Sequence, residues 1–505
     1  MSDRAAAQHW SVLRNALYGF STWGLPLALS FVATPVIVGA LGHEQYGIYA
    51  LVLGFIAYSF NFNIGRAVTK YVAEYNRRGE GARVTELFSA ALFLNLSIGL
   101  VSLLVVYAAA GPLVERVFMI APVERQKTVA ALYLAGLIIF LTMLGQLFHA
   151  VLQGIQRFDL YSKIFNVFNL TLIAGNLALA VWGFELLGLL VWNSVVVALS
   201  VVAAALAARR LVPDVKLTLR FPASSLRLVF NFSWGVVGYQ ILSNVFLLFE
   251  RGWITRRLGA EGLTYYVVPL MLAVYLHGFV SSLTLALFPL ASEIGDDRDK
   301  LRRLYTRASK FIAFLVVFMA VTLIVESRTF LALWMGPEIA ENSANLLVLH
   351  TITFGALAIY IIPFVLIESA GYPSFNFLTM AAGLSIGVPL MVALTGQYGN
   401  DGAAAARLAA YLLIFLTTPL IEKKIFGRPL FGFWLRNAVF LIAAGLAAAA
   451  CERLVVVNFS RSWPVFFAAV LAGGVVYCAV LLATGFFTAE DRQLLGRIRA
   501  GAGTR

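Results

Sequence analysis

Charged residues are scarce in this chain: they make up 12% of its 505 residues, against 61% for hydrophobic residues. A soluble domain carries about 25% charged residues, so the polar surface is too small to cover a globular protein of this size. The alternation of apolar and polar residues that marks membrane β-barrels is absent as well. The apolar residues lie in long runs, which is typical of helices that satisfy their own backbone hydrogen bonds inside lipid.

Cysteine is also scarce, and the two cysteines, Cys451 and Cys478, lie in separate apolar segments. We interpret them as membrane-buried thiols without a disulfide. The sequence has no CxxC pair and no Cys/His cluster, so we expect neither a metal site nor a resident cofactor. Ser/His/Asp and Walker-type motifs are missing too, which argues against hydrolytic chemistry and against ATP hydrolysis by this chain.

The apolar runs have the length of membrane helices, each of which needs about 20 mostly apolar residues. We therefore predict an all-α polytopic membrane protein with about fourteen transmembrane helices. The predicted spans are residues 17–40, 47–66, 87–110, 129–151, 164–183, 186–208, 230–254, 263–288, 310–327, 344–367, 375–395, 402–421, 437–456 and 463–486.

Lysine and arginine are distributed unevenly across this predicted topology. With the N-terminus on the cytoplasmic side, most of the 38 basic residues fall in segments on the inner side. Basic residues concentrate in the cytoplasmic loops of membrane proteins. We therefore predict that both termini are cytoplasmic. The membrane topology accounts for the net charge of +13, so we do not expect nucleic acid as a partner.

An internal repeat relates two turns that lie six predicted spans apart. Residues 41–49 (LGHEQYGIY) and 258–266 (LGAEGLTYY) both fit the pattern L-G-x-E-x-x-x-x-Y. The even number of spans between them predicts two six-helix lobes related by a pseudo-two-fold axis along the membrane normal, an arrangement suited to alternating access. The predicted division is residues 1–208 for the N-terminal lobe, 209–229 for a cytoplasmic linker, 230–425 for the C-terminal lobe, and 426–505 for an extra helix pair with a cytoplasmic tail.

The loops between the predicted spans are short, and none is long enough to fold as a domain. The longest hydrophilic stretches are basic and lie at residues 67–86, 209–229 and 291–309. Within the first of these, Thr69–Glu86 is either an amphipathic helix at the membrane interface or a solvated loop.

Several short motifs resemble those of a known family. They are LGHEQYGIY at residues 41–49, followed by Gly65 and by KYVAE at residues 70–74; LQGIQRF at residues 152–158; the pair Glu250-Arg251 shortly before Gly259; and YGNDGAA at residues 398–404. By these motifs and its topology, the chain resembles the polysaccharide and oligosaccharide-lipid flippases (Wzx-type) of the multidrug/oligosaccharidyl-lipid/polysaccharide exporter superfamily.

The resemblance implies a MATE-like transporter in the bacterial inner membrane. Its substrate would be a polyprenyl-diphosphate-linked oligosaccharide, carried from the inner to the outer leaflet for the synthesis of exopolysaccharide, capsule or O-antigen. The implied partners are this glycolipid, membrane lipids and the polysaccharide polymerase or export machinery. Whether H⁺ or Na⁺ is coupled to the transport step stays open.

A flipped glycolipid brings a diphosphate and a hydrated sugar into the membrane, so charged and polar residues in or beside the spans are candidate ligands. Arg66 is the first candidate for phosphate, because a guanidinium binds two phosphate oxygens at once. Lys70 and Arg251 are further basic candidates. Asn63 shares a helix face with Arg66 and, with Asn61, would contact sugar hydroxyls. Snorkelling of Arg66 to the headgroups, and hydrogen bonds between helices for the asparagines, are the alternatives.

Glu250 and His277 are the candidates for ion coupling. Glu250 either takes a coupling proton or forms a structural ion pair with a basic neighbour. His277 lies within a predicted span and either carries a proton or packs as a hydrogen-bonded histidine.

Three other functions compete with the one that the resemblance implies. A flippase for a lipid-linked peptidoglycan precursor would handle a closely similar substrate. A cation-coupled multidrug exporter would favour a carboxylate-rich cavity in the N-terminal lobe, whereas the first six predicted spans contain almost no carboxylate. A membrane polysaccharide polymerase or ligase would need a sizeable outer loop with catalytic Arg or His, and the predicted outer loops are short.

Overall fold

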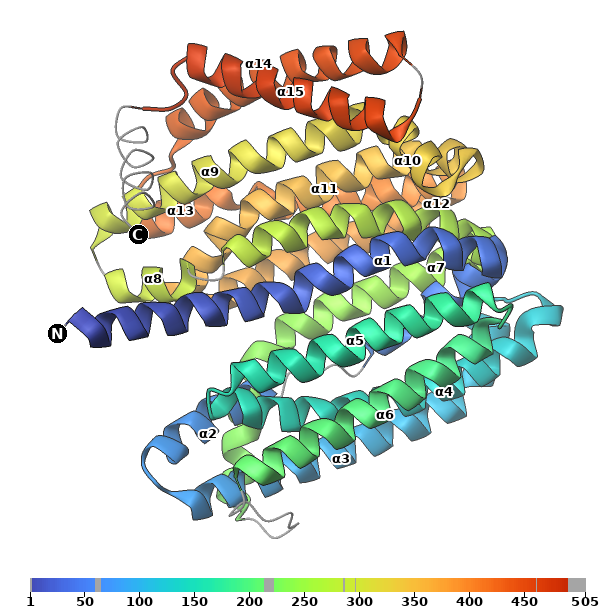
Figure 1. The fold of residues 1–505 in the computed structure, drawn as a ribbon, viewed down its shortest axis with the longest axis vertical. Coiled ribbons are helices and arrows are strands. Elements are labelled where there is room, and N and C mark those ends of the chain that lie inside the picture. The colour runs from blue at the N-terminus through green and yellow to red at the C-terminus, as the bar shows by residue number, and fades with distance from the viewer. Residues whose placement is uncertain are drawn as a thin grey trace. The chain divides into compact units, whose positions relative to one another are not determined.

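The structure is a computed structural model, and it describes residues 2–59, 65–212, 222–284, 287–295, 297–459 and 461–488. Throughout these ranges the regular elements are helices (Figure 1). The predicted all-α fold class is therefore confirmed.

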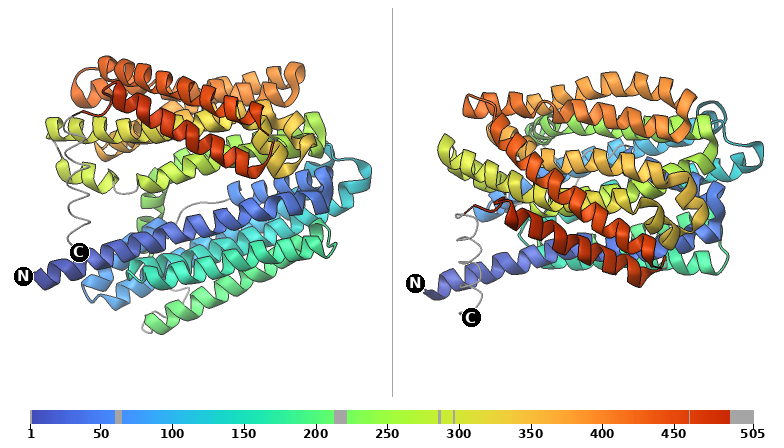
Figure 2. Two further views of the ribbon diagram at one scale, coloured as in Figure 1. Left: turned by 45° about the horizontal axis from the view of Figure 1, so that its top comes forward. Right: turned by 90° about the horizontal axis from the view of Figure 1, so that it is seen from above.

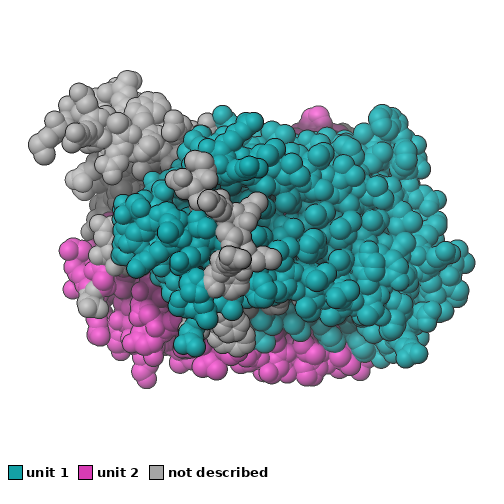
Figure 3. All heavy atoms as spheres, turned by 90° about the horizontal axis from the view of Figure 1, so that it is seen from below, with its two compact units in different colours: residues 1–264 teal, residues 265–505 magenta. Residues whose placement is uncertain are grey.

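The chain forms two compact units, Met1–Thr264 and Tyr265–Arg505, which Figure 3 distinguishes by colour. The boundary between them falls inside one long helix, α7 (Ala223–Leu283). The predicted lobes, 1–208 and 230–425, rest on the internal repeat of the sequence, whereas the two units are defined by contacts within the chain. The lobes therefore stay a prediction.

In the first unit, α1 packs against α5, α3 packs against α4, and α4 packs against α6. The same helices run side by side in Figures 1 and 2. The elements of this unit are α1 (Ser2–Tyr58), α2 (Gly65–Arg77), α3 (Gly81–Pro112), the short π-helix η1 (Leu113–Val117), α4 (Pro122–Gly154), α5 (Phe158–Val181), α6 (Leu186–Leu211) and the first part of α7.

In the second unit, α11 packs against α9, α10 and α12, whereas α14 packs against α15 and α9. The extra helix pair, α14 and α15, is thus attached to the rest of its unit mainly through α9. The elements of this unit are the remainder of α7, α8 (Leu287–Ile294), α9 (Arg298–Val325), α10 (Ser327–Met335), α11 (Pro337–Ser369), α12 (Pro373–Phe415), α13 (Thr418–Phe426), α14 (Phe431–Asn458) and α15 (Trp463–Ala483).

The described residues contain eleven helical stretches that are long and apolar enough to cross a membrane. Three of them, Gly24–Tyr58, Gln240–Leu283 and Pro373–Phe426, contain a bend at a glycine, and each corresponds to two of the predicted spans. The eleven stretches therefore account for the fourteen predicted spans. The chain is a multi-pass membrane protein.

Glycine permits these bends because it has no Cβ to clash with the backbone. Gly42 has φ 74° and ψ 166°, and Gly259 has φ 78° and ψ 174°. The N-terminus and α2 lie at the same end of the first unit in Figure 1, so the chain reverses at Gly42. The glycines of the two copies of the L-G-x-E motif thus share one backbone conformation, and each copy bends its helix at the equivalent position.

The stretch at residues 67–86 is neither a solvated loop nor a single interfacial helix. It contains the end of α2, a turn at residues 78–80 and the start of α3. Ala67, Val68 and Val72 are fully buried in a core shared with α3 and α4. The amphipathic pattern of α2 therefore serves to pack the helix against its own unit.

Candidate functional site

Two of the predicted ligands, Arg66 and Lys70, lie in α2. Asn61 and Asn63 fall outside the described residues, as does the side chain of Arg66, the second residue of α2. Lys70 lies four residues after Arg66, which places both on one helix face. Lys70 is exposed, and its ammonium lies 4.8 Å from the centroid of the Tyr71 ring. The roles of these residues as ligands stay predictions.

Arg251 lies in α7 and reaches across to α1. Its guanidinium donates a hydrogen bond to the carbonyl oxygen of Ala50 and lies 5.5 Å from the centroid of the Tyr58 ring. Gly54 provides the space for this side chain, since a Cβ on Gly54 would lie 2.5 Å from Cδ of Arg251. Arg251 therefore sits beside the last turns of α1, just before the chain leads into α2.

Carboxylates are rare inside the helices of the first unit. Glu250, next to Arg251 in α7, is 1% exposed. Among the described residues from 24 to 211, no Asp or Glu is buried. The predicted scarcity of buried carboxylates in the first six spans therefore holds for the part of those spans that the structure describes.

The two repeated turns contact each other within the first unit. Thr264 donates a hydrogen bond from Oγ1 to the carbonyl oxygen of His43, at 2.6 Å. A Cβ on Gly47 would collide with the carbonyl oxygen of Ala260, so the two backbones meet directly there. In the repeat, His43 is equivalent to Ala260 and Gly47 to Thr264. Equivalent residues of the two copies therefore meet at both contacts of this junction.

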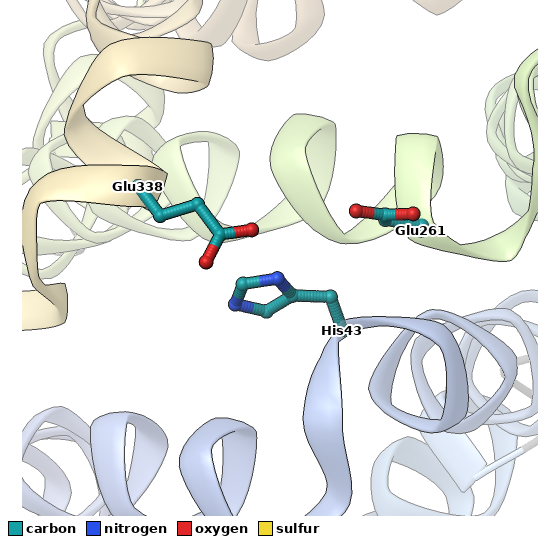
Figure 4. Close-up of side chains that lie close together, drawn as sticks. All are labelled: His43, Glu261 and Glu338. Carbon is teal, nitrogen blue, oxygen red and sulfur yellow. The ribbon is translucent and has the colours of Figure 1, made fainter.

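Figure 4 shows two side chains of this junction, His43 and Glu261. A ring nitrogen of His43 and a carboxylate oxygen of Glu261 lie within 4.8 Å of one another. Glu338, also labelled in Figure 4, belongs to the second unit, where its carboxylate accepts a hydrogen bond from the Tyr265 hydroxyl at 2.8 Å.

The tyrosine that ends each copy of the motif lies in a polar cluster. The hydroxyl of Tyr49 accepts hydrogen bonds from the amides of Asn176, at 3.1 Å, and Asn193, at 3.4 Å. In the second unit, the ring centroid of Tyr266 lies 4.7 Å from that of His350 and 5.9 Å from the Arg407 guanidinium. Both tyrosines are buried, so each copy of the motif places polar groups inside its own unit.

Arg407 is a charged residue that the sequence analysis missed. Its side chain is fully buried, and its guanidinium lies 5.6 Å from the centroid of the Phe354 ring. The ring of His277 packs edge-on against the same phenylalanine, with 6.1 Å between centroids. The signal was available, because Arg407 lies inside the predicted span 402–421, and charges within membrane helices are rare and usually functional.

Comparison with known proteins finds a matching family model and similarity to transport proteins. The family model described as "Polysaccharide biosynthesis protein" matches residues 12–295. A putative O-antigen transporter of Shigella flexneri is 24% identical over 399 residues, which is 78% of this chain and 93% of that protein.

Two solved structures have a similar fold. The lipid II flippase MurJ in an inward closed conformation has a TM-score of 0.68 at 16% identity, covering 95% of this chain and 99% of that one. An inward-facing multidrug resistance MATE family transporter of the MOP superfamily has a TM-score of 0.67 at 14% identity, covering 81% and 98%. The predicted MATE-like fold is thereby confirmed. Because the family model matches more than half of its length, the chain belongs to the polysaccharide biosynthesis protein family.

Proposed function

We propose that this protein is a flippase that moves a polyprenyl-diphosphate-linked oligosaccharide from the inner to the outer leaflet of the bacterial inner membrane by alternating access. Family membership carries the proposal, because the match to polysaccharide biosynthesis proteins extends over residues 12–295. The Shigella flexneri relative, a putative O-antigen transporter, supports the same substrate class. The glycan would then serve in exopolysaccharide, capsule or O-antigen synthesis.

The basic residues of the first unit are suited to hold the diphosphate. We assign Arg66, Lys70 and Arg251 as phosphate ligands, with Arg66 as the principal one. A guanidinium carries five N–H donors, so Arg251 can hold the Ala50 carbonyl and still bind phosphate oxygens. Asn61 and Asn63 are assigned to the sugar hydroxyls.

Ion coupling is assigned to two residues, one in each unit. Glu250 is a buried carboxylate beside Arg251, a position in which protonation would change the charge next to a proposed phosphate ligand. His277 lies in the cluster with Phe354 in the second unit. We propose H⁺ or Na⁺ as the coupling ion, cytoplasmic termini, and a functional partnership with the polysaccharide polymerase or export machinery.

A flippase for peptidoglycan lipid precursors is the second candidate function, favoured by the fold similarity to MurJ. A multidrug exporter has less support, because no described carboxylate between residues 24 and 211 is buried to bind a cationic drug. A polymerase or ligase has no support from the relatives, which are transporters.

The decisive test is a deletion strain complemented with the wild type, Arg66→Ala or Arg66→Lys, with lipid-linked repeat units measured separately in each leaflet. We expect the deletion strain without a complementing gene, and the strain that carries Arg66→Ala, to retain the lipid-linked repeat units in the inner leaflet and to lose surface polymer. We expect Arg66→Lys to restore part of the flux, because an ammonium keeps the charge but loses bidentate binding. Arg78→Ala is the matched control, because Arg78 is exposed and paired with Glu74 at 2.8 Å.

Polymer loss with lipid-linked units accessible in the outer leaflet would refute the flippase proposal and indicate a step after translocation. Loss of viability on deletion, with accumulation of peptidoglycan precursors inside, would favour the second candidate function. Normal flux in Arg66→Ala with loss of flux in the deletion would keep the function and remove Arg66 from the site.

A further inference from the structure

A pair of buried carboxylates lies where α9, α10, α14 and α15 meet in the second unit. Glu326 lies between α9 and α10, and Glu452 lies within α14. Both residues are 0% exposed, and neither is among those assigned to transport or ion coupling. Carboxylates inside a membrane protein are costly and usually serve a function, so this pair is a candidate site.

The end of α9 brings the two carboxylates together. Thr322 and Glu326 are four residues apart, so their side chains lie on one face of the helix. The helix continues through this turn, because the N–H of Glu326 donates a hydrogen bond to the carbonyl oxygen of Thr322 at 3.0 Å. The Thr322 hydroxyl in turn donates a hydrogen bond to Oε1 of Glu452 at 2.9 Å. Glu326 and Glu452 are therefore near enough for their negative charges to interact.

Gly473 in α15 covers the pair from another side. A Cβ on Gly473 would lie 2.5 Å from Oε1 of Glu452, so α15 can approach this closely because the residue has no side chain. The helix carries no charged residue, and its Tyr477 hydroxyl donates a hydrogen bond to the carbonyl oxygen of Phe314. α15 therefore shields Glu452 from the surroundings without neutralising its charge.

Most of the carboxylate oxygens of this pair lack a hydrogen-bond donor. Among the described residues, none donates a hydrogen bond to Oε1 or Oε2 of Glu326 or to Oε2 of Glu452. A buried oxygen without a donor loses the hydrogen bonds that water gave it, and the loss is larger when the group is charged. Two neighbouring carboxylates that are buried from water cannot both stay ionised without a compensating positive charge.

Two arginines near the pair supply only part of this charge. Arg453, next to Glu452 in α14, and Arg461, just before α15, are exposed, and their charges act on Glu326. Water and salt screen exposed guanidiniums, so they offset the buried charge incompletely. The Thr329 hydroxyl in α10 lies near Glu326 without completing a hydrogen bond to either of its oxygens. The remaining deficit fits a ligand with one positive charge better than one with two.

We infer that the carboxylates of Glu326 and Glu452, together with the Thr322 hydroxyl, form a binding site for one monovalent cation, either Na⁺ or a proton. Oxygen atoms are the ligands that hard cations prefer, and two neighbouring carboxylates can also share a proton. In either case the cation supplies the positive charge that the surrounding side chains do not. Because its ligands come from α9 and α14, the occupied site fastens the extra helix pair, α14 and α15, to the rest of its unit.

Thermal unfolding of the purified full chain tests this inference, with Na⁺ and protons varied separately. In the first series, NaCl replaces N-methyl-D-glucamine chloride at constant ionic strength and constant pH. A Na⁺ site should raise the unfolding midpoint by about 3 °C at a Na⁺ concentration about tenfold above the dissociation constant.

The second series omits Na⁺ and lowers the pH from about 8 to about 6, a range in which ordinary carboxylates stay ionised. A proton site should raise the midpoint by a similar amount as the pH falls, because the folded pair then binds a proton that the unfolded chain releases. Na⁺ should have no effect in that case, so the two series distinguish the two cations.

Glutamine variants show whether a response comes from this site. Glu326→Gln/Glu452→Gln should respond to neither cation and should unfold at or above the cation-free midpoint of the wild type, because neutral amides need no compensating charge. That midpoint excludes misfolding as the cause of the lost response. Glu341→Gln is the matched control in the same unit, because Glu341 is 75% exposed in its pair with Arg328, and it should respond as the wild type does.

Three results would overturn the inference. The first is a wild-type midpoint that changes with neither Na⁺ nor pH, and the second is a response that the double glutamine variant keeps. The third is stabilisation by Mg²⁺ but by neither monovalent cation, because the site would then take a divalent ion. The test measures stability rather than transport, so its outcome does not depend on the flippase proposal.

Discussion

The carboxylate of Glu422 connects three helices at a single buried point. It accepts hydrogen bonds from the Tyr305 hydroxyl in α9, at 2.8 Å, and from the Trp434 indole in α14, at 2.6 Å. A third comes from the backbone N–H of Leu430, at 2.7 Å. The residue is fully buried in α13, and three donors offset the cost of removing its charge from water.

We expect Glu422→Gln to lower the free energy of unfolding by about 2 kcal/mol, because the new amide N–H₂ would face donors in place of an acceptor oxygen. The measurement is the midpoint of thermal unfolding of the purified protein. Glu185→Gln is the control, because Glu185 is 59% exposed in its pair with Lys127 and such surface pairs contribute at most about 1 kcal/mol. Equal shifts of the unfolding midpoint in both variants would show that the buried hydrogen bonds of Glu422 stabilise the protein no more than a surface ion pair does.

A second prediction at the scale of single residues concerns Arg407. Removing a fully buried guanidinium leaves a cavity beside Tyr266 and Phe354, so Arg407→Ala should destabilise the protein by about 3 kcal/mol. Arg407→Met fills most of the space and should recover much of the unfolding midpoint. If Arg407 instead serves transport directly, the Met variant would be stable but inactive in the leaflet assay, so stability and flux are measured together.

At the scale of elements, the repeated turns depend on close backbone approach. Gly47 allows α1 to meet α7 at Ala260, where a Cβ would collide with a carbonyl oxygen. The equivalent contact, from Thr264 to His43, is a hydrogen bond. The two equivalent positions of the repeat therefore differ in side chain, with glycine at residue 47 and threonine at residue 264.

We expect Gly47→Ala to disrupt the junction of α1 and α7, because a backbone carbonyl cannot move aside as the end of a flexible side chain can. The yield of folded protein and its unfolding midpoint should both fall. Gly39→Ala is the control on the same helix, since a Cβ there meets nothing within 4 Å. A wild-type unfolding midpoint for Gly47→Ala would contradict the close approach of the two turns.

At the scale of the whole molecule, the distribution of basic residues predicts which ends of the helices face the cytoplasm. Single cysteines can test this in a Cys451→Ser/Cys478→Ser background, with a membrane-impermeant maleimide. Cysteines at Glu185 and Glu341, whose side chains are 59% and 75% exposed, should react in cells with an intact inner membrane. Cysteine at Arg78, 55% exposed, should react only after the inner membrane is opened. The reverse pattern would invert the predicted topology.

The amino-acid sequence by itself determined the fold class and the number of spans. Charged residues are scarce, and the apolar runs of about 20 residues have the length of a membrane span. Inside lipid, such runs form helices, because a helix satisfies all of its own backbone hydrogen bonds. The sequence also revealed the repeat. Both copies of the motif carry a glycine, Gly42 and Gly259, because the backbone bends there with a positive φ that glycine adopts readily. Arg251 was recognised as a candidate because a charged residue within an apolar run can be identified from the sequence alone.

The tertiary structure alone decided which residues meet. Sequence patterning left the stretch Thr69–Glu86 open between an interfacial helix and a loop, because an amphipathic face does not reveal whether protein or lipid covers it. The contact of Tyr305 with Glu422 and that of Tyr266 with Arg407 join residues far apart in the chain, 117 positions in the first case. Such contacts depend on how helices pack, and helix packing is set by the shapes of many side chains together rather than by any local pattern.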